Sequence, residues 1–118
     1  EKGWKITGSD ELGLFYGIGK FLHTAKWSET EFVPNPPTEF SSPDCSFRVI
    51  YPANHFNNWY QEAPAEELQR YMEDLLLWGY NAIITILPVL HFGGKDDPGF
   101  KATLAASKAM LQAAKNCR

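Results

Sequence analysis

Apolar positions change their spacing several times along the chain, and each change predicts an element. Over residues 11–22 they recur at helical spacing, and Asp10 just before them has the chemistry of a helix N-cap. A short strand-like stretch at residues 5–7 precedes this helix. Gly13 and Gly17 lie four apart and share one helix face, although glycine weakens a helix. Close packing of that face against another backbone would explain them.

Residues 28–46 break the pattern and predict an extended connector. Four of the chain's eight prolines fall in these residues, among serine, threonine, asparagine and glutamate. Proline and the residue before it disfavour helix, so a domain boundary is expected here. The sequence is accordingly divided into residues 1–40 and residues 41–118.

Beyond the connector the pattern predicts a strand, a helix, a strand and a helix. Residues 47–51 are rich in β-branched and aromatic side chains, and Pro64 opens a helix that Gly79 can stop. Residues 81–87 are almost continuously apolar, which is typical of a strand buried on both faces of a parallel sheet. The order is that of βα units in an α/β protein.

The last helix has its own start signal, because Asp97 supplies a cap and a proline follows it. Four apolar residues lie on one side of this helix: Phe100, Leu104, Leu111 and Ala114.

Two strands with two helices cover too little of a parallel sheet to be stable alone. The chain begins at Glu1, without an initiator Met or a signal-peptide pattern. We therefore expect a piece, or the ordered part, of a longer α/β protein.

Composition and charge narrow the function classes. The 118 residues are 44% hydrophobic and 21% charged, which is ordinary for a globular domain. The net charge of −3 argues against a nucleic acid or an anionic membrane as the main partner. No apolar run reaches the roughly 20 residues that span a bilayer. Cys45 and Cys117 permit one disulfide at most, and two free thiols are an equal alternative.

Candidate binding residues follow the first predicted strand, where α/β proteins bind ligands. They combine amides and aromatic rings in one loop: Asn54, His55, Asn57, Asn58 and Trp59. Amides offer paired donors and acceptors, and aromatic faces offer flat apolar surfaces, which is the combination that sugars require. The alternative is that the asparagines cap turns and the aromatic rings pack beneath the loop.

Two further candidates flank this loop. Arg48 lies early in the first strand, where it is either a surface residue or a buried charge whose fork suits carboxylate or hydroxyl recognition. His91 follows the second strand across the same predicted mouth, with an ordinary loop or core histidine as the alternative. No spacing of ligands predicts a metal site, and no motif predicts a cofactor. No carboxylate pair suggests the acid and base of glycoside hydrolysis.

Several segments together resemble glycoside hydrolases of the β-hexosaminidase and α-glucuronidase type. Residues 6–8 and 11–18 are similar to the strand and the helix, with a "G-x-F-Y-G" pattern, that end a small α/β domain before the barrel. A proline-bearing connector and the strand that carries Arg48 follow in the same order. Residues 54–58, NHFNN, are similar to an "N-H-W-D-N" segment, and residues 77–83 to the start of the second barrel strand.

The resemblance implies a partial (β/α)8 (TIM) barrel preceded by the tail of a small α/β accessory domain. Residues 1–40 would be that tail with the connector, and residues 41–118 the first two βα units. It also implies that Arg48 contacts the sugar at the cleavage point, with Asn54 and His55 on the wall. Asn57 stands where the α-glucuronidase segment has Asp, so sugar specificity does not carry over.

The leading hypothesis is a fragment of a carbohydrate-active glycoside hydrolase that supplies sugar-binding wall residues but not the catalytic carboxylates, which the family has on later strands. Its partners would be an oligo- or polysaccharide and the rest of the longer protein, which we call the parent. The location would be secreted or periplasmic. One alternative is a non-catalytic carbohydrate-binding or scaffold module, and another is a small α/β domain unrelated to sugars.

Overall fold

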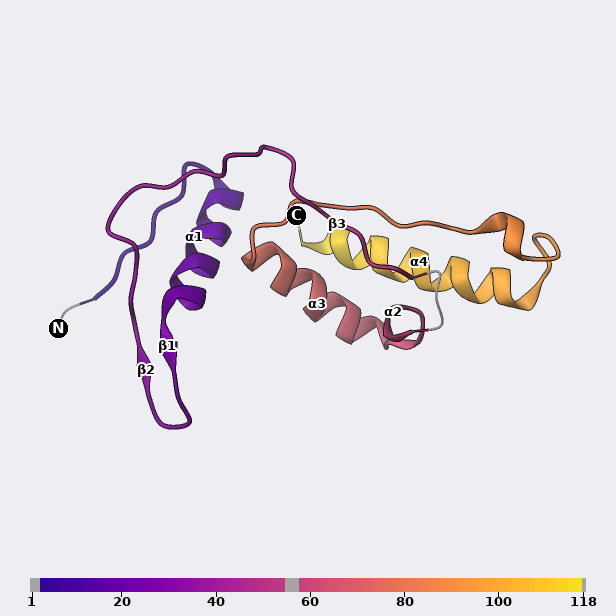
Figure 1. Cartoon of the computed structure of the whole chain (residues 1–118), viewed down its shortest axis with the longest axis horizontal. Coiled ribbons are helices and arrows are strands. Elements are labelled where there is room, and N and C mark those ends of the chain that lie inside the picture. The colour runs from indigo at the N-terminus through magenta and orange to yellow at the C-terminus, as the bar shows by residue number, and fades with distance from the viewer. Residues whose placement is uncertain (1–2, 55–57, 118) are drawn as a thin grey trace.

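A computed structural model describes residues 3–54 and 58–117 of the chain. Its elements, in chain order, are α1 (Glu11–Thr24), β1 (Lys26–Trp27), β2 (Phe32–Val33), β3 (Val49–Ile50), α2 (Trp59–Glu62), α3 (Ala65–Leu77), β4 (Ala82–Ile83), the 3₁₀ helix η1 (Val89–His91) and α4 (Pro98–Asn116). The molecule measures 62 × 34 × 19 Å. Figure 1 shows α1 and the β1–β2 hairpin at one end, and β3, α3 and α4 at the other.

The fold class is confirmed at the level of α/β. Within the described residues, four α-helices and two small two-stranded sheets form a mostly helical fold. β1 and β2 pair antiparallel, whereas β3 and β4 pair parallel. The strands described do not close a barrel.

Helix α1 begins where its cap predicts. The Asp10 carboxylate accepts a hydrogen bond from the Gly13 N–H at 2.7 Å. The expected close approach of a second backbone is present, but at Gly19, where an added Cβ would collide with the Leu77 carbonyl at the end of α3. Residues 5–7 do not form the expected strand, since no partner strand lies beside them among the described residues.

The β1–β2 hairpin lies inside the segment expected to be an extended connector. A turn closes it, with the Ser28 N–H donating to the Glu31 carbonyl at 2.9 Å. Aromatic rings hold it against α1: Phe21 meets Phe32 edge-on at 5.9 Å, and Phe32 lies 4.6 Å from Trp27. The proline-bearing residues after the hairpin are irregular, as their composition predicts.

The parallel pair is built as a strand, a helical crossover and a strand. Val49 pairs with Ala82 and Ile50 with Ile83. Gly79, at φ 92°, ends the crossover helix α3 in the left-handed region, as predicted from its position. The Gly79 and Tyr80 N–H groups return to the carbonyls of the last helical turn, which turns the chain directly into β4.

The core lies between α3 and α4, beneath one face of the parallel pair. It is formed by five buried residues: Leu68, Met72, Leu75, Met110 and Ala113. The buried side of α4 also includes two hydroxyl residues, Thr103 and Ser107. Leu111, which the sequence placed on the apolar side of this helix, is 47% exposed.

The other face of the parallel pair is exposed. Ile84 and Ile86, which directly follow β4, are large and apolar but open to solvent, as are Phe47 and Tyr51 around β3. The expectation that residues 81–87 are buried on both faces is therefore wrong for the described chain. The helices cover one face, and no second layer of described residues covers the other.

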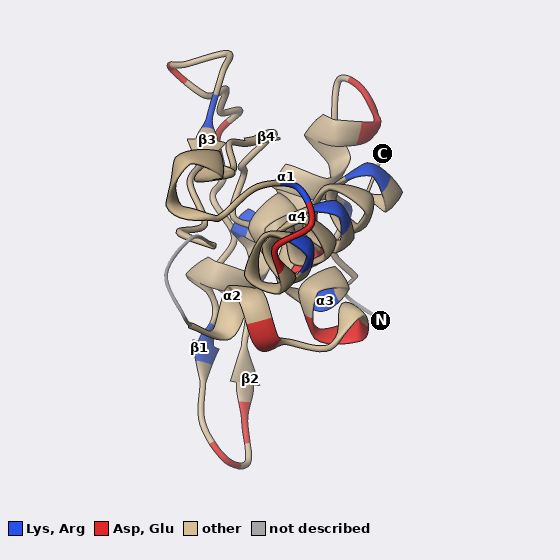
Figure 2. Cartoon of the chain, turned by 90° about the vertical axis from the view of Figure 1, so that its right-hand side faces the viewer, with Lys and Arg blue, Asp and Glu red and all other residues tan. Residues whose placement is uncertain are grey.

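Acidic residues gather in the turn of the β1–β2 hairpin and at the start of α3, where Figure 2 shows them coloured red. Glu66 and Glu67 occupy the first turn of α3, where the helix dipole favours them. None of the helices in the described ranges combines the length and the hydrophobicity needed to cross a bilayer.

Candidate functional site

The candidate site lies at the carboxyl ends of β3 and β4, where the loops after both strands begin. Because the strands are parallel, their carboxyl ends share one edge of the sheet. Two of the predicted site residues, His55 and Asn57, lie outside the described residues. The structure describes Asn54, Asn58, Trp59 and His91 on these loops, and it places Arg48 elsewhere.

Asn54 is fully buried, and both ends of its amide are used within the protein. Its oxygen accepts a hydrogen bond from Thr85 Oγ1 at 2.7 Å, and its nitrogen donates to Ser107 Oγ at 2.6 Å. Ser107 in turn donates to the Thr103 carbonyl within α4. The amide therefore fixes the loop after β3 to the loop after β4 and to α4, which is a positioning role for any ligand bound above it.

Asn58 caps the short helix α2. Its side-chain oxygen accepts from the Tyr60 N–H at 3.1 Å, and its nitrogen donates to the Ala53 carbonyl at 2.8 Å. This is the turn-capping alternative that the sequence left open for the asparagines. Helix α2 itself was not predicted, because only four residues form it.

Trp59 lies in the first turn of α2, and its aromatic ring is exposed to solvent. Its side chain is 44% exposed. Its ring meets Tyr60 edge-on at 5.4 Å and Tyr71 of α3 edge-on at 5.5 Å. Trp59 Nε1 also donates to Glu67 Oε2 at 3.3 Å. The indole is therefore held in one orientation while part of its surface stays open.

The two tyrosines beneath Trp59 form a hydrogen-bonded pair. The Tyr60 and Tyr71 hydroxyl oxygens lie 3.1 Å apart. Burial raises the pKa of Tyr71 above its ordinary value, and the hydrogen bond with Tyr60 raises it further. Gln61 on the same helix donates to Thr103 Oγ1 at 3.2 Å, so α2 is joined to α4 as well.

His91 ends η1 and is exposed. Its backbone N–H donates to the Pro88 carbonyl at 3.0 Å. Within residues 3–54 and 58–117, no hydrogen bond or ring contact joins His91 to the aromatic residues around Trp59. The structure therefore does not bring His91 into contact with Trp59 or with the tyrosines beside it.

Arg48 lies at the opposite end of β3 from Asn54. Its Nε donates to the Gly79 carbonyl at 2.5 Å and one terminal nitrogen donates to the Cys45 carbonyl at 2.7 Å. Its guanidinium carbon lies 4.8 Å from the ring centre of Tyr16 on α1. The structure thus groups Arg48 with α1 and the end of α3, and not with the loops that follow the strands.

The chemistry available at the carboxyl edge is recognition of a ligand by contact and hydrogen bonding. The carboxylate of Glu67 is occupied in orienting the indole of Trp59, from which it accepts a hydrogen bond. No group of three or more His, Cys, Asp or Glu residues in the described ranges could hold a metal ion. Cys45 and Cys117 are both free thiols.

Three residues that position this site were not among the predicted ones: Thr85, Thr103 and Ser107. A signal for each is present in the sequence. Thr85 is the polar residue inside the apolar run 82–87. When such a hydroxyl is buried, it needs a hydrogen-bond partner. Thr103 and Ser107 lie four apart, one helical turn, on the side that Met110 continues.

Comparison with protein-family models, with curated proteins and with solved structures finds no match for this chain.

Proposed function

We propose that the chain is part of a carbohydrate-active glycoside hydrolase and contributes to the wall of its sugar-binding site, without supplying the catalytic carboxylates. The observation that carries the proposal is the exposed indole of Trp59, oriented by Tyr60, Tyr71 and Glu67 at the carboxyl edge of a parallel strand pair. An aromatic ring held open to solvent is suited to the C–H face of a pyranose.

The arrangement around the strands supports a larger parallel sheet. β3, the α2–α3 crossover, β4 and α4 follow in the order of two βα units, with the helices on one face. The opposite face presents Phe47, Tyr51, Ile84 and Ile86 to solvent, although parallel sheets are ordinarily covered on both faces. In a (β/α)8 barrel that face would be the interior, and further strands of the parent would pair with the free edges.

The resemblance to β-hexosaminidases and α-glucuronidases supports the same function. In glycoside hydrolysis two carboxylates flank the scissile bond. The proposal assigns them to later strands of the parent, so the 118-residue chain alone is expected to be inactive. A secreted or periplasmic parent suits a polymeric sugar substrate. Of the predicted wall residues, the proposal rests on Trp59, because Asn54 and Asn58 use their amides within the protein.

The test is binding of defined sugars to the intact chain. Hexasaccharides of β-glucose, β-xylose and N-acetylglucosamine, with glucuronic acid-substituted xylo-oligosaccharide, are titrated by calorimetry while tryptophan fluorescence is recorded. We expect saturable binding of one of them. The Trp59→Ala variant should weaken that binding by roughly fivefold, since stacking on an aromatic ring supplies on the order of 1 kcal/mol.

The matched control is Trp27→Ala, because Trp27 is also largely exposed but lies in the β1–β2 hairpin. Circular dichroism verifies that both variants are folded. Absence of binding across the sugars, or an equal loss in both variants, would contradict the proposal.

The alternative is a non-catalytic carbohydrate-binding or scaffold module with the same fold. It would use the Trp59 surface in the same way, since that surface needs no catalytic group. Turnover of aryl glycosides by the parent separates the two, because a binding module gives none.

A further inference from the structure

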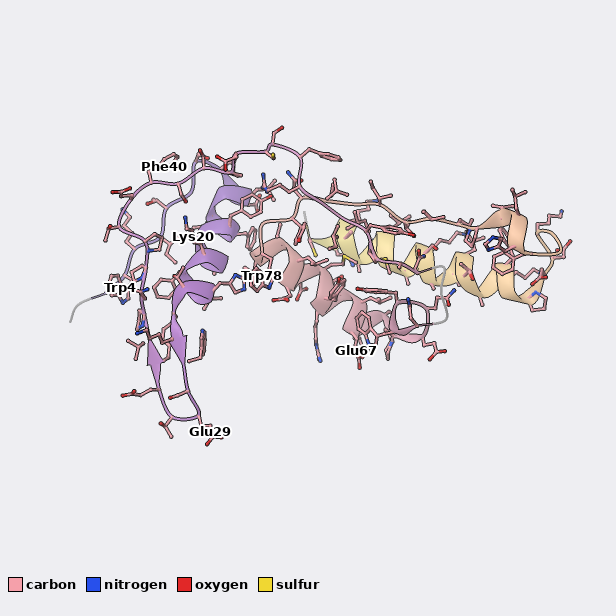
Figure 3. All side chains as sticks on the ribbon, in the orientation of Figure 1. Trp4, Lys20, Glu29, Phe40, Glu67 and Trp78 are labelled. Carbon is pink, nitrogen blue, oxygen red and sulfur yellow. The ribbon has the colours of Figure 1, made fainter. Side chains whose placement is uncertain are left out.

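A recessed site lies apart from the exposed ring of Trp59, between α1, the connector and the carboxyl end of α3. The cleft encloses about 770 Å³ and is lined by residues of all three segments, including Tyr16, Lys20, Arg48 and Trp78. Figure 3 shows Lys20 on α1, with Phe40 of the connector on one side and Trp78 at the end of α3 on the other. Among the predicted site residues that the structure describes, Arg48 lines this cleft and the others do not.

The two walls of the cleft are locked together by close contacts. Gly19 brings α1 against the Leu77 carbonyl, which leaves no room for a Cβ. One turn further, His23 stacks on Trp78 with ring centres 3.7 Å apart. On the other side of Gly19, the guanidinium of Arg48 covers Tyr16. The cleft is therefore part of the folded arrangement and not a gap between independent pieces.

Two of the cations in this cleft, Lys20 and Arg48, donate to neutral acceptors. Lys20 Nζ donates to Ser41 Oγ at 2.8 Å. Arg48 donates to two backbone carbonyls, those of Gly79 and Cys45. Neither forms an ion pair, because the ion pair found within the described ranges joins Lys101 and Asp96 on the surface. Both therefore keep a charge that no carboxylate in the described ranges neutralises.

Tyr16 adds a donor that has no acceptor. Its hydroxyl oxygen is buried and lacks a hydrogen-bond partner, which is true of no other buried side-chain nitrogen or oxygen that the structure describes. Buried hydroxyls are ordinarily paired, because an unmade hydrogen bond is costly. Lys20 lies one helical turn from Tyr16 on the same face of α1. The Tyr16 hydroxyl therefore lacks an acceptor for its proton.

The remaining charges in the cleft favour an anionic acceptor. The lining includes Lys5 as well as Lys20 and Arg48, and one carboxylate, that of Glu39. Glu39 does not form an ion pair with any of these groups. The local balance is therefore positive in a chain whose net charge is −3. Such a cleft concentrates anions, and lysine and arginine bind oxyanions through strong charge-assisted hydrogen bonds.

We propose that this cleft binds an oxyanion, a carboxylate or a phosphoryl group, through Lys20, Arg48 and the Tyr16 hydroxyl. The ligand would displace the side chains that cover the Tyr16 O–H, which would then donate to one oxygen, and the ammonium and guanidinium groups would neutralise the charge. The proposal does not depend on sugar binding at Trp59, because the two sites share no residue.

The probes are sodium phosphate and sodium glucuronate, titrated into the intact chain in Tris chloride of low ionic strength, with neutral glucose as a blank. Calorimetry gives the affinity, and amide shifts in NMR spectra locate the site. We expect saturable binding of at least one probe, with shifts at α1 and residues 36–43. Binding of phosphate alone identifies a phosphoryl ligand, and binding of glucuronate alone identifies a carboxylate. Either result supports the oxyanion site.

Two variants test the residues without disturbing the Arg48 contacts. Lys20→Gln and Tyr16→Phe should each weaken binding roughly tenfold, because each removes a donor to a charged group. Tyr16→Phe keeps the ring beneath Arg48 and removes an unpaired buried hydroxyl, so its melting temperature should equal or exceed that of the wild type. The control Lys101→Gln removes the same charge from the surface and should leave the affinity unchanged.

Failure of both probes to bind saturably would overturn the proposal. So would an equal loss of affinity in Lys101→Gln and Lys20→Gln, which would show only a general attraction of charge. Unchanged binding by a folded Tyr16→Phe variant would remove the hydroxyl from the site and contradict the proposal as stated.

Discussion

Thr85 and Asn54 come from the loops after two different strands, and Thr85 Oγ1 donates a hydrogen bond to the buried Asn54 amide at 2.7 Å. The same amide donates to Ser107 on α4. One side chain thus joins both loops at the carboxyl edge of the sheet to the helix that packs beneath them.

Replacing Asn54 with alanine should therefore destabilise the protein. The change leaves the Thr85 and Ser107 hydroxyls without this partner in a covered site, and each such loss costs about 1 kcal/mol or more. We expect the free energy of unfolding to fall by about 2 kcal/mol, measured by urea denaturation. Asn35→Ala, an exposed amide in the connector, serves as the control and should unfold like the wild type. An Asn54→Ala variant as stable as the control would show that the amide does not hold the loops.

Gly19 should tolerate alanine far less than its neighbour Gly17. A Cβ at Gly19 would collide with the Leu77 backbone, whereas at Gly17 it would meet only a methyl group of Ile6, which can move. Alanine gains about 1 kcal/mol of helix propensity at either position. We expect Gly17→Ala to be neutral or stabilising, and Gly19→Ala to be destabilising by about 1–3 kcal/mol because overpacking against backbone cannot relax.

Thermal unfolding followed by circular dichroism compares the two glycine variants directly. Trp78 fluorescence reports the joint itself, because His23 stacks on this ring only while α1 is docked. Equal stability of the two variants would mean that α1 is not pressed against the end of α3.

The elements with local signals were predictable, and those that depend on distant partners were not. Asp10 and Asp97 cap their helices and Gly79 ends α3, because these residues act on the backbone within a few positions. The β1–β2 hairpin was missed because its two paired residues on each side have no alternating pattern long enough to read.

The candidate site shows the same division. Residue type indicated that the loop after β3 carries polar and aromatic groups, but not which of them face solvent. Asn54 is buried because Thr85 and Ser107, distant in sequence, supply its partners. The direction of Arg48 is likewise set by Gly79 and Tyr16, which no local pattern connects to it. Amide and guanidinium groups suit a ligand or an internal partner equally well, and only the fold decides between them.

The raised pKa of Tyr71 gives a test at alkaline pH. Burial, and then the hydrogen bond with Tyr60, favour the neutral phenol in the folded state. The unfolded chain deprotonates Tyr71 at its ordinary value near 10, so this stabilisation is complete below about pH 10 and is lost as pH rises through the higher folded value. Titration of tyrosinate absorbance should show a late phase that is missing in Tyr71→Phe.

Tyr60→Phe provides the matched comparison for that titration. It removes the hydrogen bond but keeps the ring, so the late phase should move towards ordinary tyrosine values without reaching them, because burial is the larger cause. An unchanged late phase in Tyr71→Phe would assign it to another tyrosine.

Asp97 gives the corresponding test at acid pH. Its carboxylate accepts hydrogen bonds from the Gly93, Gly99 and Phe100 N–H groups, in that order of effect, and these lower its pKa below the ordinary value of 3.8. The stabilisation is complete above that ordinary value and is lost as pH falls through the folded value. The stability difference between wild type and Asp97→Asn should therefore be constant near neutrality and shrink on acidification.

Denaturant unfolding of both proteins at a series of pH values measures this difference. Asp44→Asn, an exposed carboxylate in the connector, serves as the control for the change in net charge. A difference that does not depend on pH would show that the ionised cap contributes nothing beyond the shape of the side chain.

The exposed face of the β3–β4 pair predicts how the isolated chain behaves in solution. Ile84 and Ile86 directly follow β4, where apolar side chains with free strand edges favour association. We expect the wild-type chain to self-associate, measured by analytical ultracentrifugation across a range of concentrations. The double variant Ile84→Thr with Ile86→Thr should be more monomeric, since threonine keeps the β preference and adds a hydroxyl.

Leu90→Thr is the control, because Leu90 is 97% exposed in η1, away from the strands. A wild-type chain that stays monomeric and unfolds in one cooperative transition would show that the exposed face needs no cover, and would contradict its assignment to a larger barrel.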